Sequence, residues 1–478
     1  MSDWQCVIGL EVHVQLNTMS KIFSPTATAY GALANSQASA VDIALPGVLP
    51  VMNREAVAKA IIFGLAVGGT IERRSIFARK NYFYPDLPKG YQISQYELPI
   101  VRGGSIDFDE DDHLRKIRLT RAHLEEDAGK SVHEDFGAMS GIDLNRAGTP
   151  LLEVVSEPDI RSPAEAVTYL RTLHTLVRYL DICDGNMQEG SFRCDANVSI
   201  RPRGDKQLGT RTELKNINSF RFVEQALHYE IERQIEIVER GGQVSQETRL
   251  YDPVRGDTRA MRSKEEAHDY RYFPDPDLPP LVIDDGLLKE AQAAIPELPG
   301  KRRSRFMQEY GLSAVDARQL ADQRDLGDFF EAAVVAAAGD ARSVANWMTG
   351  EMAAGLNSAQ QDVLQSPVDP TMLGEMILLI NDGTISGRIA KTVFEAMWRG
   401  EGGAREVIDT HDLTQLSDSG ALEKAVAEVL NNCPEQVTQY QAGQTKVLGF
   451  LVGQVMKLTS GKANPQKVNE ILQRRLSG

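Results

Sequence analysis

The chain has 478 residues, more than one hydrophobic core usually holds, so its length predicts two to four domains. Hydrophobic residues at 42% and charged residues at 25% are typical of an ordinary soluble globular protein. The net charge of −15 argues against a protein that coats nucleic acid indiscriminately, because neutralising phosphates requires lysine and arginine.

The N-terminus reads MSDWQCVIGLEVH and lacks the basic and apolar regions of a signal peptide. No stretch approaches the roughly 20 apolar residues that span a bilayer. We therefore expect a cytoplasmic protein with no membrane association. The cysteines form no C-x-x-C pair, so neither a zinc site nor a disulfide framework is expected.

Two segments alternate apolar and polar residues, the pattern of a strand with one buried face. In CVIGLEVHVQL, residues 6–16, the polar face presents Glu11 and His13. In FRCDANVSIR, residues 192–201, Arg193, Asp195 and Asn197 share a face. Each segment taken alone is equally consistent with a strand whose polar face is simply solvated.

Three adjacent acids, Glu125, Glu126 and Asp127, occur in RAHLEEDAGK, residues 121–130, between His123 and Lys130. A surface loop would dilute their repulsion in water, which is the simpler interpretation. The alternative is a site for a hard divalent cation, and such a site needs acidic partners from elsewhere in the chain.

Further acids supply such partners. Glu153 interrupts the apolar run 151–155, where an acid is costly to bury without a cation or hydrogen-bond donors. Glu213 and Lys215 share a face of another expected strand. Oxygen ligands of this kind suit magnesium, which bridges to substrate phosphates, so the set resembles a phosphoryl-transfer site.

The usual loop motifs of nucleotide and acyl-transfer enzymes are absent. The sequence contains no G-x-x-x-x-G-K-[ST], so a nucleotide would be held by side chains such as Lys80 and Arg193. It contains no G-x-S-x-G, and Cys194 falls on the apolar face of its strand. We therefore expect no covalent acyl-enzyme chemistry from this chain alone.

The C-terminal part is predicted to be helical. From residue 216 the spacing of apolar residues becomes helical and marks Phe222, Ala226 and Tyr229 as a buried stripe. Residues 273–300 are rich in proline and mark a domain edge. Beyond them helix formers dominate. In the last part the expected buried positions are Leu422, Val426 and Val429 in one helix and Val447, Phe450, Leu451, Gln454 and Val455 in another.

The tail differs in charge from the rest of the chain. Residues 441–478 carry a net charge of +5, to which Lys446 and Lys457 contribute, on a chain of net charge −15. The asymmetry suggests that this tail contacts phosphates of a nucleic acid; the simpler alternative is that its lysines only solubilise a helical module.

Six long motifs, in order, resemble the B subunit of the bacterial tRNA-dependent amidotransferase GatCAB. They are KNYFYPDLPKGYQISQ (80–95), LNRAGTPLLEVVSEPDIRSPAEA (144–166), EGSFRCDANVSIRP (189–202), TELKNINSF (212–220), DYRYFPDPDLPPL (269–281) and GFLVGQVMK (449–457). The resemblance implies an α+β protein: a cradle-like antiparallel sheet domain over residues 1–292, a helical domain over 293–405, and a small all-α YqeY-like tail over 406–478. We expect this tail to contact tRNA phosphates.

The resemblance also implies an activity. The B subunit uses ATP and magnesium to phosphorylate the side-chain carboxylate of glutamate or aspartate mischarged on tRNA. Ammonia from the glutaminase A subunit then attacks the acyl phosphate, within a heterotrimer that includes a C subunit. Matching positions imply catalytic Glu11, Glu125, Glu153 and Glu213; nucleotide contacts from Lys80, Ser191, Arg193, Asn197 and Lys215; and metal ligands Glu11, His13, Glu125, Glu126 and Asp195.

One departure from the family concerns zinc. Some members carry zinc-binding cysteines just after the first strand, but the segment SKIFSPTATAYGALANSQ, residues 20–37, has none, so we expect no zinc. Two rival functions remain open from the sequence. Clustered acids also occur in metal-dependent nucleases, and a tRNA-binding scaffold could carry purely structural acids.

Overall fold

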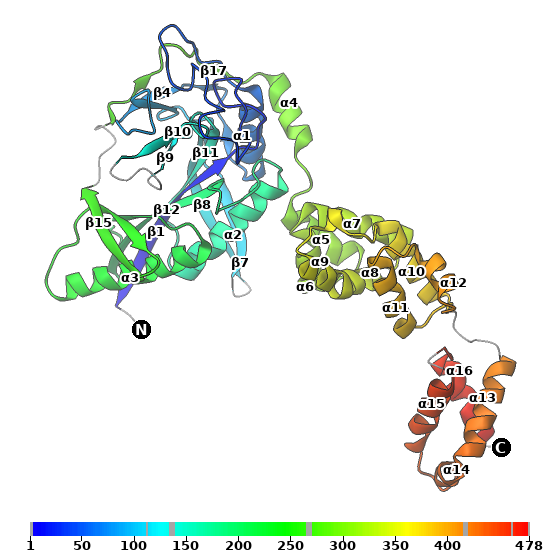
Figure 1. The fold of residues 1–478 in the computed structure, drawn as a ribbon. Coiled ribbons are helices and arrows are strands. Elements are labelled where there is room, and N and C mark those ends of the chain that lie inside the picture. The colour runs from blue at the N-terminus through cyan, green and yellow to red at the C-terminus, as the bar shows by residue number, and fades with distance from the viewer. Residues whose placement is uncertain are drawn as a thin grey trace. The chain divides into compact units, whose positions relative to one another are not determined.

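The computed structural model describes residues 3–110, 113–132, 139–263, 270–413, 419–459 and 462–476. The chain folds as two compact units, Met1–Leu298 and Pro299–Gly478 (Figure 1). The domain boundaries expected at 292/293 and 405/406 stay predictions.

A ten-stranded sheet forms the centre of the first unit, in the order β15-β14-β13-β12-β1-β11-β8-β6-β2, with β7 also paired to β8. Its strands are β1 (Trp4–Gln15), β2 (Thr70–Ile71), β6 (Val101–Arg102), β7 (Ser105–Glu110), β8 (His113–Glu126), β11 (Pro150–Ser156), β12 (Phe192–Pro202), β13 (Thr212–Lys215), β14 (Glu247–Asp252) and β15 (Asp257–Ser263). The α+β class is confirmed. One pair, β13 and β14, is parallel rather than antiparallel, because helix α3 carries the chain between these two strands.

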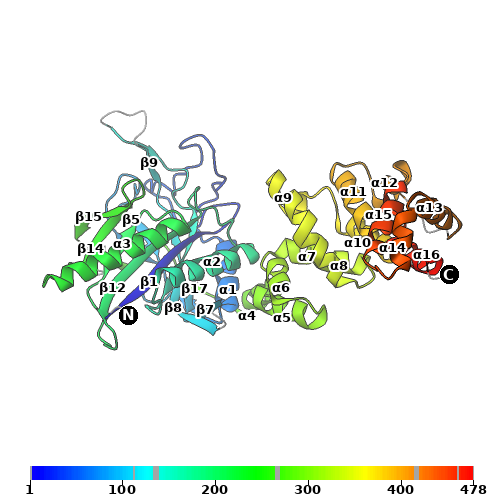
Figure 2. The same ribbon diagram turned by 90° about the horizontal axis from the view of Figure 1, so that it is seen from below.

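The expected alternation holds in the central strands. Ile8, Leu10, Val12 and Val14 of β1 are buried, and the intervening residues are only partly buried. Helices α2 (Pro163–Tyr179) and α3 (Phe220–Glu239) lie side by side over β1 and β12 (Figure 2). One face of the sheet is thus closed by helices, so polar residues on the other face can line a site.

The buried stripe of α3 differs from the expected one. The helix begins after Ser219, whose hydroxyl accepts a hydrogen bond from the backbone N–H of Phe222. From this start the helical period buries Val223, Ala226 and Leu227, whereas Phe222 and Tyr229 are only partly buried. The expectation was correct for Ala226 and wrong for the other two residues.

Smaller elements border the open face of the central sheet. A three-stranded sheet contains β4 (Ala78–Asn81), β5 (Tyr91–Ser94) and β16 (Phe273–Pro274), and β5 packs against β8. The remaining elements of this unit are α1 (Arg54–Ala66), β3 (Arg74–Ser75) paired with β17 (Leu281–Val282), β9 (Lys130–Val132) paired with β10 (Gly141–Asp143), and α4 (Asp285–Ala294).

The second unit is helical in its described part. Its α-helices are α5 (Pro299–Glu309), α6 (Ala314–Ala321), α7 (Arg324–Ala336), α8 (Ala341–Trp347), α9 (Ala353–Ala359), α10 (Pro370–Asn381), α11 (Gly387–Trp398), α12 (Ala404–Thr410), α13 (Ser419–Asn432), α14 (Pro434–Gln441), α15 (Val447–Leu458) and α16 (Pro465–Leu476). One hydrophobic core spans α5 to α12, and a separate core joins α13, α15 and α16. None of the described helices is long and apolar enough to cross a membrane.

The small core of the tail agrees with most of the expected pattern. Leu422, Val426 and Val429 are buried, as predicted. In α15, Leu451 and Val455 are buried, but Phe450 is 48% exposed because it lies about 100° around the helix from Leu451. Lys446 and Lys457 are exposed, which the expected tRNA contact requires. The sequence also predicts a turn over residues 460–465, part of which lies outside the described residues.

Candidate active site

Polar residues of neighbouring strands meet in rows on the open face of the central sheet. In one row His123 of β8 lies opposite Glu153 of β11, and Glu153 lies opposite His13 of β1. In the next row Glu11 lies opposite Asp195 of β12. This register, invisible in any single strand, brings together acids that are far apart in the sequence.

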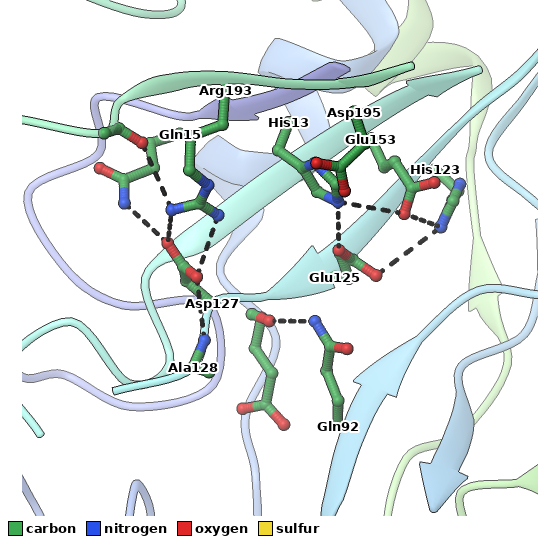
Figure 3. Close-up of polar contacts among 12 residues, drawn as sticks. His13, Gln15, Gln92, His123, Glu125, Asp127, Ala128, Glu153, Arg193 and Asp195 are labelled. Carbon is green, nitrogen blue, oxygen red and sulfur yellow. Dashed lines mark hydrogen bonds and ion pairs between the residues drawn. The ribbon is translucent and has the colours of Figure 1, made fainter. Parts of the chain in front are cut away.

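The first row and Glu125 form a closed ring of four side chains (Figure 3). His13 Nε2 lies 3.6 Å from Glu125 Oε1 and 3.6 Å from Glu153 Oε2. His123 Nε2 lies 3.4 Å from Glu153 Oε2 and 3.8 Å from Glu125 Oε2. We call His13, His123, Glu125 and Glu153 the His–Glu ring.

Contacts within the ring shift the pKa values of His13, His123 and Glu153. Burial alone would lower the pKa of His13, but the hydrogen bond and charge of Glu153, with the charge of Glu125, raise it to about 9. Burial would likewise lower the pKa of His123, and the same two carboxylates raise it. Although burial opposes the change, the two histidines hold the pKa of Glu153 well below its usual value. Such perturbation is characteristic of functional sites.

The ring fits a divalent cation. His13, Glu125 and Glu153 each offer one ligand atom, and these three atoms lie within 4.8 Å of one another. Glu125 Oε2 is buried and has no hydrogen-bond partner among the described residues, which is costly unless another group binds there. Two carboxylate oxygens and one imidazole nitrogen are ligands that divalent cations accept.

A second polar group lies beside the ring and includes acids from β1, β12 and β13. Asn197 Nδ2 donates to Glu11 Oε1 at 2.9 Å, and Lys215 forms ion pairs with Asp195 and, at 3.2 Å, with Glu213. Despite burial, these two acids raise the pKa of Lys215. The acids of this group have hydrogen-bond or ion-pair partners on β12 and β13, whereas Glu125 Oε2 has no hydrogen-bond partner among the described residues.

Both groups line one cavity of about 1060 Å³. Lys80 also lines it, with its Nζ 4.9 Å from the centre of the Tyr270 ring and 5.7 Å from that of Tyr82. Burial opposes ionisation of Lys80, but nearby groups that include Glu125 raise its pKa, so Lys80 remains a cation. Of the expected site residues the cavity collects nine: Glu11, His13, Lys80, Glu125, Glu153, Asp195, Asn197, Glu213 and Lys215.

Glu126 does not join the ring, which corrects its expected place among the metal ligands. Neighbouring residues of a strand point to opposite faces, so Glu126 points away from Glu125. Its carboxylate pairs with Lys89 and accepts a hydrogen bond from the backbone N–H of Ile93 at 2.8 Å. The structure therefore separates Glu126 from His13.

Arg193 and Ser191 are also absent from the described lining of the cavity. Arg193 donates to both carboxylate oxygens of Asp127, at 2.8 and 3.1 Å, and Gln15 Nε2 donates to the same carboxylate at 2.7 Å. Burial alone would raise the pKa of Asp127, but the charge and hydrogen bonds of Arg193 lower it to about 2. Ser191 Oγ donates to Asp184 at 3.3 Å. This arrangement therefore does not support the expected contacts of Arg193 and Ser191 with a nucleotide.

The structure also adds residues that the sequence did not single out as part of a site. His123 lies two residues before Glu125 in β8, so strand alternation already places both on one face. Arg121, Tyr96, Tyr270 and Tyr272 line the cavity as well. The tyrosines flank short strands without a clear period, and no sequence signal indicated that they meet.

Two family models match the chain. The GatB/GatE catalytic domain matches residues 6–289, which contain the whole His–Glu ring, and the GatB domain matches residues 328–476. The first match alone covers more than half of the chain.

Curated relatives are similar over nearly their full length. The B subunit of the aspartyl/glutamyl-tRNA(Asn/Gln) amidotransferase from Thioalkalivibrio sulfidiphilus is 62% identical, over 99% of this chain and 100% of its own. Proteins of the same name from Nitrosococcus oceani and Pseudomonas syringae pv. syringae are 62% and 59% identical, over 99% and 100% of this chain and 100% of their own lengths. These matches confirm the resemblance seen in the motifs, and the chain belongs to the GatB family.

Proposed function

We propose that this chain, as the B component of a tRNA-dependent amidotransferase, uses ATP and Mg²⁺ to activate a carboxylate attached to tRNA and then converts it to an amide. The substrates are glutamate carried by tRNA(Gln), aspartate carried by tRNA(Asn), or both. The observation that carries the proposal is the His–Glu ring, a cation-sized set of ligands inside a cavity that also holds Lys80.

The chemistry explains why such a cavity is needed. A carboxylate oxygen of the substrate forms a bond to the γ-phosphorus of ATP, and the bond to the β-phosphate oxygen breaks to release ADP. Ammonia then attacks the acyl carbon, inorganic phosphate leaves, and the nitrogen loses a proton. The first step brings two anions together, so positive charge must lie between them.

The residues of the cavity supply this charge and its geometry. His13, Glu125 and Glu153 would hold the magnesium ion, whose role when bound is to neutralise and orient the phosphate oxygens. Lys80 provides a fixed cation on the same cavity wall. We assign Glu11, Asp195 and Glu213, which Asn197 and Lys215 hold in place, to orienting the reacting groups.

The proposal also defines the partners. Because the chain has no predicted nucleophile for hydrolysing glutamine, we infer that a glutaminase A subunit supplies ammonia and that a C subunit completes the heterotrimer. We place this complex in the cytoplasm and expect it to need no zinc.

A coupled assay separates this proposal from its rivals. The complex should release ADP from ATP only when Glu-tRNA or Asp-tRNA is present, and the aminoacyl product should become Gln-tRNA or Asn-tRNA when ammonium is supplied. A nuclease would instead cleave tRNA without ATP. A tRNA-binding scaffold would consume no ATP. ATP hydrolysis unaffected by aminoacyl-tRNA would contradict the proposal.

A further inference from the structure

Three tyrosines from separate segments meet on one wall of the cavity. Tyr96 follows β5, and Tyr270 and Tyr272 precede β16, which pairs with β4 next to β5. The rings of Tyr96 and Tyr272 are stacked, with centres 4.3 Å apart and planes 9° apart, and Tyr270 meets Tyr272 at 70°. We call Tyr96, Tyr270 and Tyr272 the aromatic wall.

The backbone holds this wall in place. Arg271, between two of the tyrosines, has a left-handed φ of 46°, a conformation that costs free energy for a residue other than glycine. The side chain of Asn81 in β4 fixes this bend by donating to the carbonyl oxygens of Tyr270 and Arg271, at 3.2 and 2.9 Å. The wall is therefore attached to the same strand that carries Lys80.

Cations flank the aromatic wall on the cavity side. Lys80 Nζ lies 4.9 Å from the centre of the Tyr270 ring, and Arg121 Cζ lies 5.7 Å from that of Tyr96. Arg121 Nε is buried and has no hydrogen-bond partner in the described part of the chain. A ligand that lies against the wall thus has two positive groups within reach, an arrangement suited to phosphate.

The stacked pair also lines a second, mostly apolar hollow. This hollow, of about 80 Å³, is lined by Tyr96 and Tyr272 together with Ile76, Ala78, Leu98, Phe273, Pro274 and one acid, Glu97. The stacked pair therefore stands where an apolar hollow adjoins a polar cavity with cations. A flat, uncharged ring joined to a phosphate matches both surroundings, because a nucleobase stacks on aromatic side chains while its phosphates seek cations.

We propose that Tyr272, which stacks on Tyr96 with one face, offers its other face to the adenine ring of an adenosine-containing ligand. The inference rests on the proposed function, which gives this cavity two such ligands: ATP, and the terminal adenosine of the aminoacylated tRNA. Either ligand would place its base on the aromatic wall and its reacting group toward the His–Glu ring, with Lys80 between them.

Equilibrium binding to the complex containing the full-length chain tests the inference. Four ligands form two matched pairs: ATP with inorganic tripolyphosphate, which lacks the base, and tRNA ending in CCA with the same tRNA ending in CC. Tyr272→Ala should weaken binding of ATP, or of the CCA-ended tRNA, by about 5- to 150-fold, the usual range for one base stacked on an aromatic residue. The base-free ligand of that pair should bind with unchanged affinity. Whichever pair is affected shows whether the stacked base belongs to ATP or to the terminal adenosine of tRNA.

Two variants serve as controls. Tyr272→Phe keeps the ring without the hydroxyl and should bind like the wild type, whereas equal losses in Tyr272→Phe and Tyr272→Ala would overturn stacking in favour of a hydroxyl contact. Tyr30→Ala removes a tyrosine that is 74% exposed and is not among the described residues that line the cavity. This variant should bind all four ligands with the affinity of the wild type. If Tyr272→Ala does not fold, Tyr272→Leu, which keeps much of the volume without an aromatic ring, gives the same test.

The outcomes distinguish the inference from the function on which it rests. Unchanged affinities in folded Tyr272→Ala, or equal losses for the ligands with and without the base, would overturn the stacking site alone. Failure of the wild-type complex to bind either adenosine-containing ligand would overturn the proposed function and this inference together.

Discussion

Glu125 and Asp127 lie two residues apart, both are buried, and the structure holds them in opposite ways. Asp127 accepts hydrogen bonds from Arg193, Gln15 and the N–H of Ala128, so its charge is fully compensated (Figure 3). Glu125 faces two histidines and another acid, and one of its oxygens has no hydrogen-bond partner within the residues that the structure describes. Burial alone therefore does not mark a functional acid, whereas a buried carboxylate oxygen that lacks a hydrogen bond does.

The largest expected effect is on catalysis at Glu125. Glu125→Gln keeps the shape but removes the charge, so ADP release that depends on aminoacyl-tRNA should fall by about 100-fold or more. Glu126→Gln is the matched variant, because the neighbouring residue points away from the ring; its loss in the same assay should be much smaller. Equal losses would place Glu126 back among the ligands.

The next effect is on stability at Asp127. Asp127→Ala leaves Arg193 without its carboxylate, and breaking such a buried pair should destabilise the surrounding strands by about 3 kcal/mol. Hydrogen exchange of the β8 and β12 amides measures this local loss. In Glu125→Gln the same amides should stay protected. Similar exchange in both variants would remove the distinction between the two acids.

A smaller effect is expected at His123, which contacts both carboxylates of the ring without being required as a ligand. His123→Ala should weaken Mn²⁺ binding by about 10- to 100-fold, the usual result of removing a group that orients metal ligands. Titration with Mn²⁺, followed by its electron paramagnetic resonance signal, gives the affinity. Unchanged affinity would show that the carboxylates keep their positions without His123.

The smallest effect concerns the tail, where the charges are exposed rather than buried. If Lys446 and Lys457 contact tRNA phosphates, replacing both with Gln should weaken tRNA binding and reduce its salt dependence, by a slope of roughly 0.9 per contact on the DNA scale. Lys289→Gln, an exposed change in α4, is the control. An unchanged slope in the double variant would leave these lysines with a solubilising role only.

The sequence predicted the parts of the site that depend on local alternation. It placed Glu11 with His13, and Asp195 with Asn197, on single faces of strands, and the structure confirms both pairs. Alternation also separates Glu125 from Glu126, but the family resemblance placed both among the metal ligands. The strand period was visible in the sequence and was outweighed by the resemblance.

Other features depend on long-range pairing, which local patterns do not contain. The row from His123 through Glu153 to His13 exists only because β1, β11 and β8 pair in one register. The aromatic wall combines residues 96 and 272, which are far apart in the chain and flank short strands. In α3 the cap at Ser219 set where the buried stripe falls, so apolar spacing alone misplaced two of its three residues.

The central claim is that the His–Glu ring, and not every buried acid of the cradle, binds the catalytic cation. Crystals of the complex soaked in Mn²⁺ and measured for anomalous scattering test it most directly. The claim predicts an ion with His13, Glu125 and Glu153 within about 2.0 to 2.6 Å, and no such ion in crystals of Glu125→Gln. An ion bound instead at Asp127 or Glu126 would contradict it. So would crystals in which the His–Glu ring holds no ion although the same protein is active in solution.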